Sequence, residues 1–221
     1  MSARMTMTPR LVLFDLDGTL VDSAPDIAAA LNAALVDLGQ PTYPLPVVTS
    51  YVGDGAAKLV ERAAAPTPDV DQDLLLERFK AQYAANVCVA TKPYAGVVDV
   101  LERLRATATP LAVVTNKPGG MARELLLALA LDAFFVEILG DGDGYPRKPA
   151  PEIALAVCAR HGVAPSDTLL VGDGLPDVRL GHAAGCRVAA VTWGYTPRDQ
   201  LAAEKPDWLV DAPAELLALE R

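Results

Sequence analysis

The sequence predicts an α/β protein: a doubly wound parallel sheet, or Rossmann-like core, with an inserted all-helical cap domain. Three observations predict this fold. From Pro93 onward, short apolar segments alternate with helical ones, which is typical of parallel strands joined by right-handed crossovers. Segments such as 111–114 are apolar throughout, as strands covered on both faces are. Residues 21–92, which follow the first strand, show helical patterns only.

Composition limits the partners and the compartment. With 221 residues, 52% apolar and 21% charged, the chain is long enough for one domain with a smaller insert. A net charge of -9 argues against nucleic acid and anionic membranes, because both attract basic surfaces. Cys88, Cys158 and Cys186 are too few and too far apart for a disulfide framework, so reduced thiols are expected. The sequence shows neither a signal-like segment nor an apolar run of about 18 residues, so we expect a cytoplasmic protein. We expect it to be a monomer or a homodimer.

The first strand is predicted at residues 11–14, and it leads into a turn that carries two acids. Side chains alternate along a strand, so Asp15 and Asp17 are expected on the same face at its end. Their charges repel, and a hard cation with oxygen ligands is the simplest partner for the pair. Gly18 permits a sharp turn, and Thr19 adds a hydroxyl and an amide beside the carboxylates.

The insert after this turn is predicted to contain three helices and no strand. The first begins with Ser23 as N-cap, with Pro25 where an amide would be unpaired anyway, and it ends at Gly39. Three prolines then mark a loop over residues 41–46. The other two helices are expected at residues 56–65 and 70–87.

The segment from Pro93 to the end supplies the rest of the predicted core. Its expected helices are 97–106, 121–131, 152–161, 177–184 and 214–219, and its expected strands are 111–115, 135–139, 169–171, 188–191 and 208–210. Residues 1–20 and 93–221 are therefore expected to form the α/β core, and residues 21–92 the helical cap.

Polar residues follow several of these strands, at the edge where open α/β sheets bind ligands. The strand at 111–114 ends in Thr115, Asn116 and Lys117, whose hydroxyl, amide and ammonium groups suit phosphoryl oxygens. Lys148 lies in a loop that is stiffened by prolines on either side. The strand at 169–171 repeats the opening pattern, since it delivers further acids into a glycine turn. These are Asp173 and Asp177.

The string from Asp15 to Ser23 resembles the first motif of the haloacid dehalogenase-like phosphohydrolases, and the four polar strand ends resemble the four motifs of that family in order and spacing. The phosphoglycolate phosphatase branch is the one it resembles in particular. The resemblance implies that Asp15 is the nucleophile, Asp17 the general acid and base, and Lys148 the cation that steadies nucleophile and phosphate. It further implies that Thr115 and Asn116 bind phosphate.

The resemblance also implies a magnesium cofactor held by Asp15, Asp17 and Asp173, with Asp177 as a further ligand or a neighbouring acid. Residues 174–176, Gly-Leu-Pro, depart from the Ser-Arg-Asn that phosphoglycolate phosphatases usually carry there. The departure changes the hydrogen-bonding groups around the metal ligands and leaves the metal carboxylate in place.

The expected substrate is a small anionic phosphate ester, 2-phosphoglycolate. Gly53, Asp54 and Gly55 precede a helix, so their amides are candidates for binding an anion, or else form an ordinary interhelix turn. Lys117 is a second candidate for the substrate carboxylate. Two alternatives use the same core: a phosphatase for a sugar phosphate such as N-acetylmuramate 6-phosphate, and a β-phosphoglucomutase-like phosphotransferase. A third, a phospho-accepting receiver-like signalling module, is opposed by Asp17, by the helical insert and by the chain length.

Overall fold

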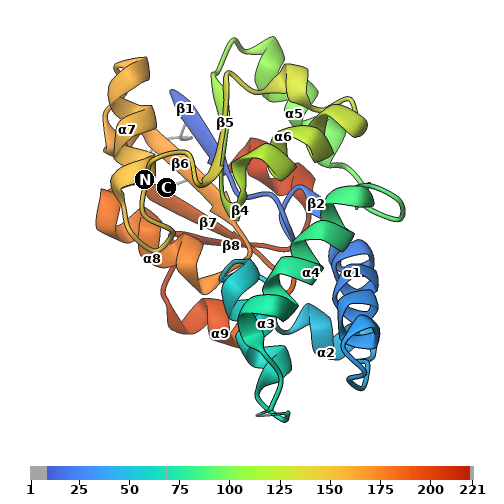
Figure 1. Ribbon diagram of the computed structural model, residues 1–221. Helices are drawn as coiled ribbons and strands as arrows, with labels where there is room; N and C mark the ends of the chain where they lie inside the picture. Colours follow the sequence, from blue (N-terminus) through green and yellow to red (C-terminus); the bar gives the residue numbers. More distant parts are fainter. Residues whose placement is uncertain (1–8, 68, 220–221) are drawn as a thin grey trace.

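The computed structural model describes residues 9–67 and 69–219. Residues 1–8 and 220–221 of the predicted core, and residue 68 of the predicted cap, lie outside the described part. A six-stranded sheet forms the centre, in the order β5-β4-β1-β6-β7-β8 with every neighbouring pair parallel (Figure 1). Its strands are β1 (Leu11–Phe14), β4 (Leu111–Pro118), β5 (Glu137–Asp141), β6 (Thr168–Gly172), β7 (Arg187–Val191) and β8 (Trp208–Val210).

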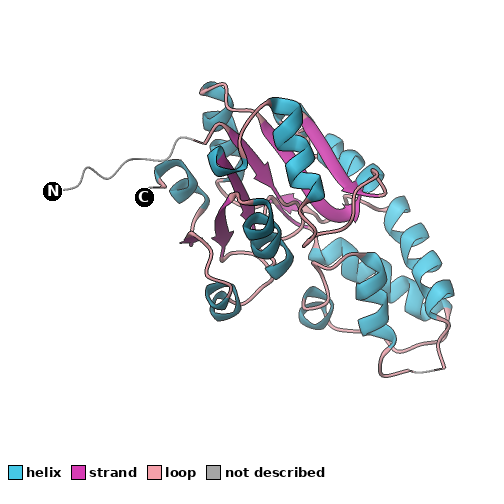
Figure 2. Cartoon of the chain, turned by 90° about the vertical axis from the view of Figure 1, so that its left-hand side faces the viewer, coloured by secondary structure: helices cyan, strands magenta, loops and turns pink. Residues whose placement is uncertain are grey.

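Helices cover both faces of this sheet, as the apolar strands require (Figure 2). Along β1, Val12 and Phe14 face one apolar core while Leu11 and Leu13 face the other. The first core is packed by α5 (Val97–Ala106), α6 (Gly119–Ala128) and the 3-10 turn η3 (Pro213–Ala218). The second is packed by α7 (Glu152–His161) and α8 (Leu175–Ala184), and α9 (Arg198–Ala203) packs against α8 beyond it. The predicted α/β fold is confirmed.

Four helices within residues 24–85 pack mainly on one another, beside the carboxyl edge of the sheet (Figures 1 and 2). They are α1 (Ala24–Asp37), α2 (Leu45–Thr49), α3 (Ala56–Ala64) and α4 (Gln72–Ala85). Two short strands, β2 (Val21–Asp22) and β3 (Lys92–Pro93), pair antiparallel where the chain enters and leaves this group. The prediction that residues 21–92 contain no strand is therefore wrong at both ends, because two-residue strands are too short for a periodic pattern.

Several other local predictions differ from the structure. The proline loop contains the short helix α2, and helix α9 was not predicted. The fifth strand begins at Glu137 instead of 135, because the 3-10 turn η1 (Asp132–Phe134) precedes it. Ser23 is the N-cap residue of α1 by position, but its side chain makes no capping hydrogen bond. No described helix is both long enough and apolar enough to cross a bilayer.

Candidate active site

The first acidic turn lies at the end of β1, between β4 and β6 in the middle of the sheet. The backbone amide of Asp15 donates to the carbonyl of Val171, which continues the pairing of β1 with β6. Gly18 has a φ of 86°, and a Cβ on it would collide with the carboxylate of Asp173. Glycine is thus required here both by the turn and by the close approach of the second acidic loop.

Three carboxylates meet at this point. Asp15, Asp173 and Asp177 are all buried, and each offers one carboxylate oxygen to a group whose atoms lie within 4.8 Å of one another. Lys148, also buried, reaches into the group from the loop before α7: its Nζ lies 2.7 Å from Asp15 Oδ1 and 2.6 Å from Asp177 Oδ1. Asp173 is held from two sides, by the hydroxyl of Thr19 at 2.9 Å and by the backbone amide of Tyr195 at 2.8 Å.

The group holds more negative than positive charge. Burial, reinforced by Asp15 and Asp177, raises the pKa of Asp173 to about 8. Burial and Asp15 likewise raise the pKa of Asp177 against the opposing effect of Lys148. Burial alone would lower the pKa of Lys148, but Asp15 and Asp177 outweigh it and raise that pKa. Among the described residues no donor makes a well-directed hydrogen bond to the buried Asp15 Oδ1, despite the nearby ammonium. Buried carboxylate oxygens in excess of cations fit a hard divalent ion.

This charge excess predicts that the metal-free protein loses stability as pH rises. Asp173 has an unfolded pKa near 3.8 and a folded pKa of about 8, so between these values the folded state binds a proton that the unfolded state has released. The free energy of unfolding should then fall with increasing pH, by up to about 1.4 kcal/mol per unit for this one group. Urea unfolding in EDTA between pH 5 and pH 8 measures the slope. Asp173→Asn should flatten it, and equal slopes in both proteins would contradict the expectation.

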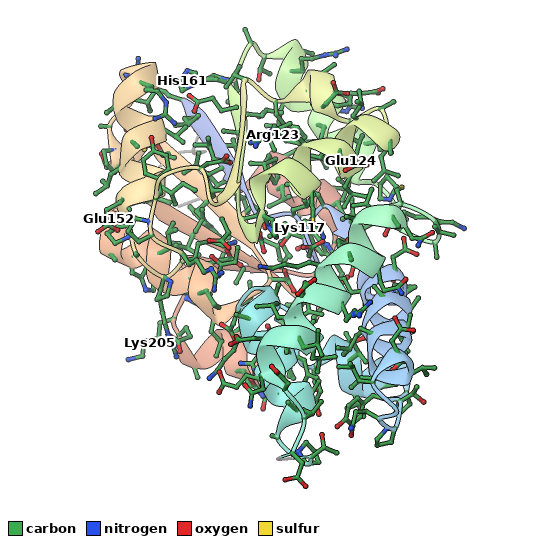
Figure 3. All side chains as sticks on the ribbon, viewed as in Figure 1. Lys117, Arg123, Glu124, Glu152, His161 and Lys205 are labelled. Carbon is green, nitrogen blue, oxygen red and sulfur yellow. The ribbon has the colours of Figure 1, made fainter. Side chains whose placement is uncertain are left out.

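Asp17 lies apart from the three-carboxylate group, although the sequence placed it among the metal ligands. Its carboxylate accepts hydrogen bonds from Lys117 Nζ at 2.9 and 3.1 Å and from Ser23 Oγ at 2.5 Å. Lys117 in turn donates to the hydroxyl of Tyr83 on α4 at 2.6 Å. Figure 3 shows Lys117 where the end of β4 faces α4. The side chain of Asp17 is thus bound by donors from the end of β4 and from the start of α1.

A cavity separates the sheet edge from the helical insert. The side facing the sheet is lined by Asp15, Asp17, Thr115, Asn116, Lys117, Pro118 and Met121, and the side facing the insert by Ile27, Val52, Gly53, Gly55, Ala56, Leu59, Phe79, Lys80 and Tyr83. Its volume is about 50 Å³. Most of this lining is apolar.

This geometry can be set beside known proteins. A model of the family described as haloacid dehalogenase-like hydrolase matches residues 12–191. The chain belongs to the haloacid dehalogenase-like hydrolase family. A phosphoglycolate phosphatase from Haemophilus influenzae is 37% identical over 95% of this chain and 97% of its own length. Phosphoglycolate phosphatase 1 from Pseudomonas aeruginosa is 40% identical over 96% of this chain and 80% of its own.

Solved structures agree with the family assignment. The crystal structure of a predicted phosphoglycolate phosphatase from Haemophilus somnus superposes with a TM-score of 0.90 at 36% identity, covering 96% of this chain and 98% of that one. A haloacid dehalogenase-like family protein from Streptococcus pneumoniae, at 24% identity, shares the fold with a TM-score of 0.83. The family resemblance in the first motif therefore extends over nearly the whole chain.

Asn116 lines the cavity, but its side chain is bound to backbone groups of two other segments. Its Oδ1 accepts from the backbone amide of Lys148 at 2.8 Å, and its Nδ2 donates to the carbonyls of Lys148 and Gly53, both at 3.2 Å. The side chain therefore joins the Lys148 loop to the helical insert. Thr115 Oγ1 accepts from the backbone amide of Lys117 at 3.2 Å and lines the cavity, where its hydroxyl proton can face a ligand.

The predicted anion-binding turn of the insert is only partly at the cavity. Gly53 and Gly55 line it, and Gly55 precedes α3 with a φ of 90°. Asp54 is not among the lining residues and forms an ion pair with Arg62 of α3. The turn thus brings the backbone of Gly53 and Gly55 to the cavity, while the carboxylate of Asp54 is paired with Arg62.

Two tyrosines at this site were not predicted. Tyr83 contributes a hydroxyl from α4, and its position within a helical apolar pattern resembled that of an ordinary core residue. Tyr195 follows β7 and contacts both the acidic group and the start of α1. Its position beyond the end of a parallel strand was the signal available in the sequence.

Proposed function

We propose that this hydrolase is a magnesium-dependent phosphatase that cleaves 2-phosphoglycolate through an aspartyl-phosphate on Asp15. The single observation that supports this best is the arrangement of Asp15 and Asp17 at the end of the central strand: both line one small cavity, and only Asp15 joins the buried carboxylates. The similarity to phosphoglycolate phosphatases over nearly the full chain supports the same activity.

The residues present fit a magnesium ion. Asp15 and Asp173 are the carboxylates that we assign as ligands, with the main-chain carbonyl of Asp17 in place of its side chain. Asp177 is paired with Lys148 and stands next to them as a further acid. When bound, the ion would offset the excess of negative charge and polarise the phosphoryl group.

In the proposed reaction a carboxylate oxygen of Asp15 attacks phosphorus, and the bond from phosphorus to the ester oxygen breaks. Lys148, 2.7 Å from Asp15, holds the nucleophile and balances charge on the phosphoryl oxygens. The Thr115 hydroxyl is placed to donate to the same oxygens. Asp17 gives a proton to the leaving alkoxide and later takes one from the water that hydrolyses the aspartyl-phosphate.

We further propose that residues 21–92 act as a cap over a core formed by residues 1–20 and 93–221. The paired strands β2 and β3 tie the two connections together, and helices α1 to α4 pack mainly on one another. Cap opening would admit the substrate, and closure would exclude water. The cross-contacts of Asn116 with Gly53 and of Lys117 with Tyr83 would form on closure.

The cavity favours a small ester with a second anion over a sugar phosphate. Its apolar lining offers few partners to the hydroxyls of a hexose. Lys80 and Lys117 are the ammonium groups in the lining, and Lys117 is the buried one. We assign Lys117 and the backbone at Gly53 and Gly55 to the substrate carboxylate.

The substrate assignment predicts discrimination against esters that lack the carboxylate. Relative to 2-phosphoglycolate, ethyl phosphate should lose at least tenfold in kcat/KM, about 1.4 kcal/mol. Phosphate release from 2-phosphoglycolate, ethyl phosphate and a hexose phosphate, each with Mg²⁺ and with EDTA, measures this. Equal efficiency on all three would refute the substrate while leaving the phosphatase chemistry intact. Stoichiometric release without turnover would instead point to a receiver-like module.

A further inference from the structure

The start of helix α1 is capped by a side chain that is distant in the sequence. The hydroxyl oxygen of Tyr195 accepts hydrogen bonds from the backbone amides of Ser23 at 2.8 Å and Ala24 at 3.0 Å. The same hydroxyl donates to Asp22 Oδ1 at 3.1 Å. The first amides of a helix have no partner within it, and Pro25 carries no amide at all. Tyr195 therefore accepts from two of the amides at the start of α1 that have no partner within the helix.

The side chain of Ser23 makes no capping hydrogen bond and is bound elsewhere. Ser23 is completely buried, and its hydroxyl donates to Asp17 Oδ1 at 2.5 Å instead of capping α1. Lys117 contacts the same carboxylate at 2.9 and 3.1 Å. The orientation of Asp17 is thus fixed by one donor from the sheet edge and one from the hinge segment 22–24. The position of that hinge segment depends on Tyr195.

Tyr195 is itself held in place at the acidic group. Its backbone amide donates to Asp173 Oδ2 at 2.8 Å, and a Cβ on the preceding Gly194 would collide with Asp173. Trp193, two residues earlier, donates from Nε1 to the carbonyl of Thr19 at 3.1 Å. The loop after β7 is therefore anchored on the two acidic turns, and from there the Tyr195 ring extends to the entry of the cap.

We propose that Tyr195 is a positioning residue for proton transfer: by capping α1 from outside, it holds the Ser23 hydroxyl on Asp17 and so orients Asp17 toward the leaving oxygen. The proposal rests on the role of Asp17 as general acid given above. It assigns to Tyr195 a function in the reaction that neither the sequence motifs nor the family assignment carries.

Two small substrates, an alkyl phosphate ester and an acyl phosphate, separate this role from a merely structural one. The ethoxide of ethyl phosphate must be protonated as it leaves, whereas the acetate of acetyl phosphate leaves as a stable anion and needs no acid. Tyr195→Phe should lower kcat/KM for 2-phosphoglycolate and ethyl phosphate at least tenfold and change that for acetyl phosphate less than threefold. The parameter kcat/KM is chosen because it reports on the first chemical step and not on hydrolysis of the aspartyl-phosphate.

Matched variants test the path through Ser23. Ser23→Ala should show the same selective loss, and Tyr195→Phe in the Ser23→Ala background should add less than twofold, because both act through one hydrogen bond. Tyr145→Phe removes a tyrosine hydroxyl that accepts from Arg160 and does not line the cavity, and it should leave kcat/KM for all three substrates unaffected.

The outcomes are distinct. A uniform loss on all three substrates, or additive effects of the two substitutions, would overturn the role of Tyr195. Should Tyr195→Phe fail to fold, Ser23→Ala decides, since the absence of a selective loss there removes the path proposed for Tyr195. Failure of the proposed function is seen separately, as no turnover of 2-phosphoglycolate by the unmodified enzyme, or as no selective loss in Asp17→Asn.

Discussion

Asp15→Asn is expected to reduce kcat/KM for 2-phosphoglycolate by at least about 10⁴-fold, roughly 5.4 kcal/mol of transition-state stabilisation. The amide keeps the shape of the side chain but cannot attack phosphorus, and it weakens binding of a metal by the buried group. The fold should persist, because the substitution removes one of three crowded carboxylates that face a single ammonium. Phosphate release with saturating Mg²⁺, together with thermal unfolding, measures both effects.

Asp199→Asn is the matched control, because Asp199 is an exposed carboxylate in the first turn of α9. It should retain the activity of the unmodified enzyme. Activity of Asp15→Asn within tenfold of the unmodified enzyme would place the nucleophile elsewhere. Loss of folding in that variant would show instead that the Asp15 contact with Lys148 is needed for stability.

The middle of the sheet could be predicted because β1, β4 and β6 each contain a buried apolar run. The side chains of residues 11–14 face two cores in alternation, and both cores are apolar. Strand type and burial therefore follow directly from the residues. Asp15, Asp173 and Lys148 could be predicted for a related reason. Each follows a strand or precedes a helix at one edge of the sheet, and that edge brings them together whatever the loop details.

Contacts that depend on the relative position of distant loops could not be predicted. Ser23 had the sequence features of an N-cap, but its hydroxyl binds Asp17, and the hydroxyl of Tyr195 accepts from the amides of Ser23 and Ala24. Asn116 has the chemistry of a phosphate ligand, yet the backbone of Lys148 lies close enough to take both ends of its amide. In both cases a partner that is distant in the sequence competes with the expected one.

Lys148→Met is expected to cause the largest loss of stability of the substitutions considered. The ammonium is buried and lies 2.6 to 2.7 Å from two carboxylates, so its removal leaves those charges uncompensated. Loss of one partner from a buried ion pair costs about 3 to 5 kcal/mol. Urea unfolding in EDTA should show a decrease of this size, and kcat/KM should fall by about 10² to 10³-fold, as for loss of an electrostatic donor.

Magnesium should restore part of the stability of Lys148→Met, and more than it adds to the unmodified protein, because a cation at Asp15 and Asp173 replaces some of the missing positive charge. Lys58→Met is the control: Lys58 forms an exposed pair with Glu61 on α3, which contributes at most about 1 kcal/mol. If Lys148→Met were no less stable in EDTA than Lys58→Met, the carboxylates would have to be neutral without the lysine. The charge balance inferred for the site would then be wrong.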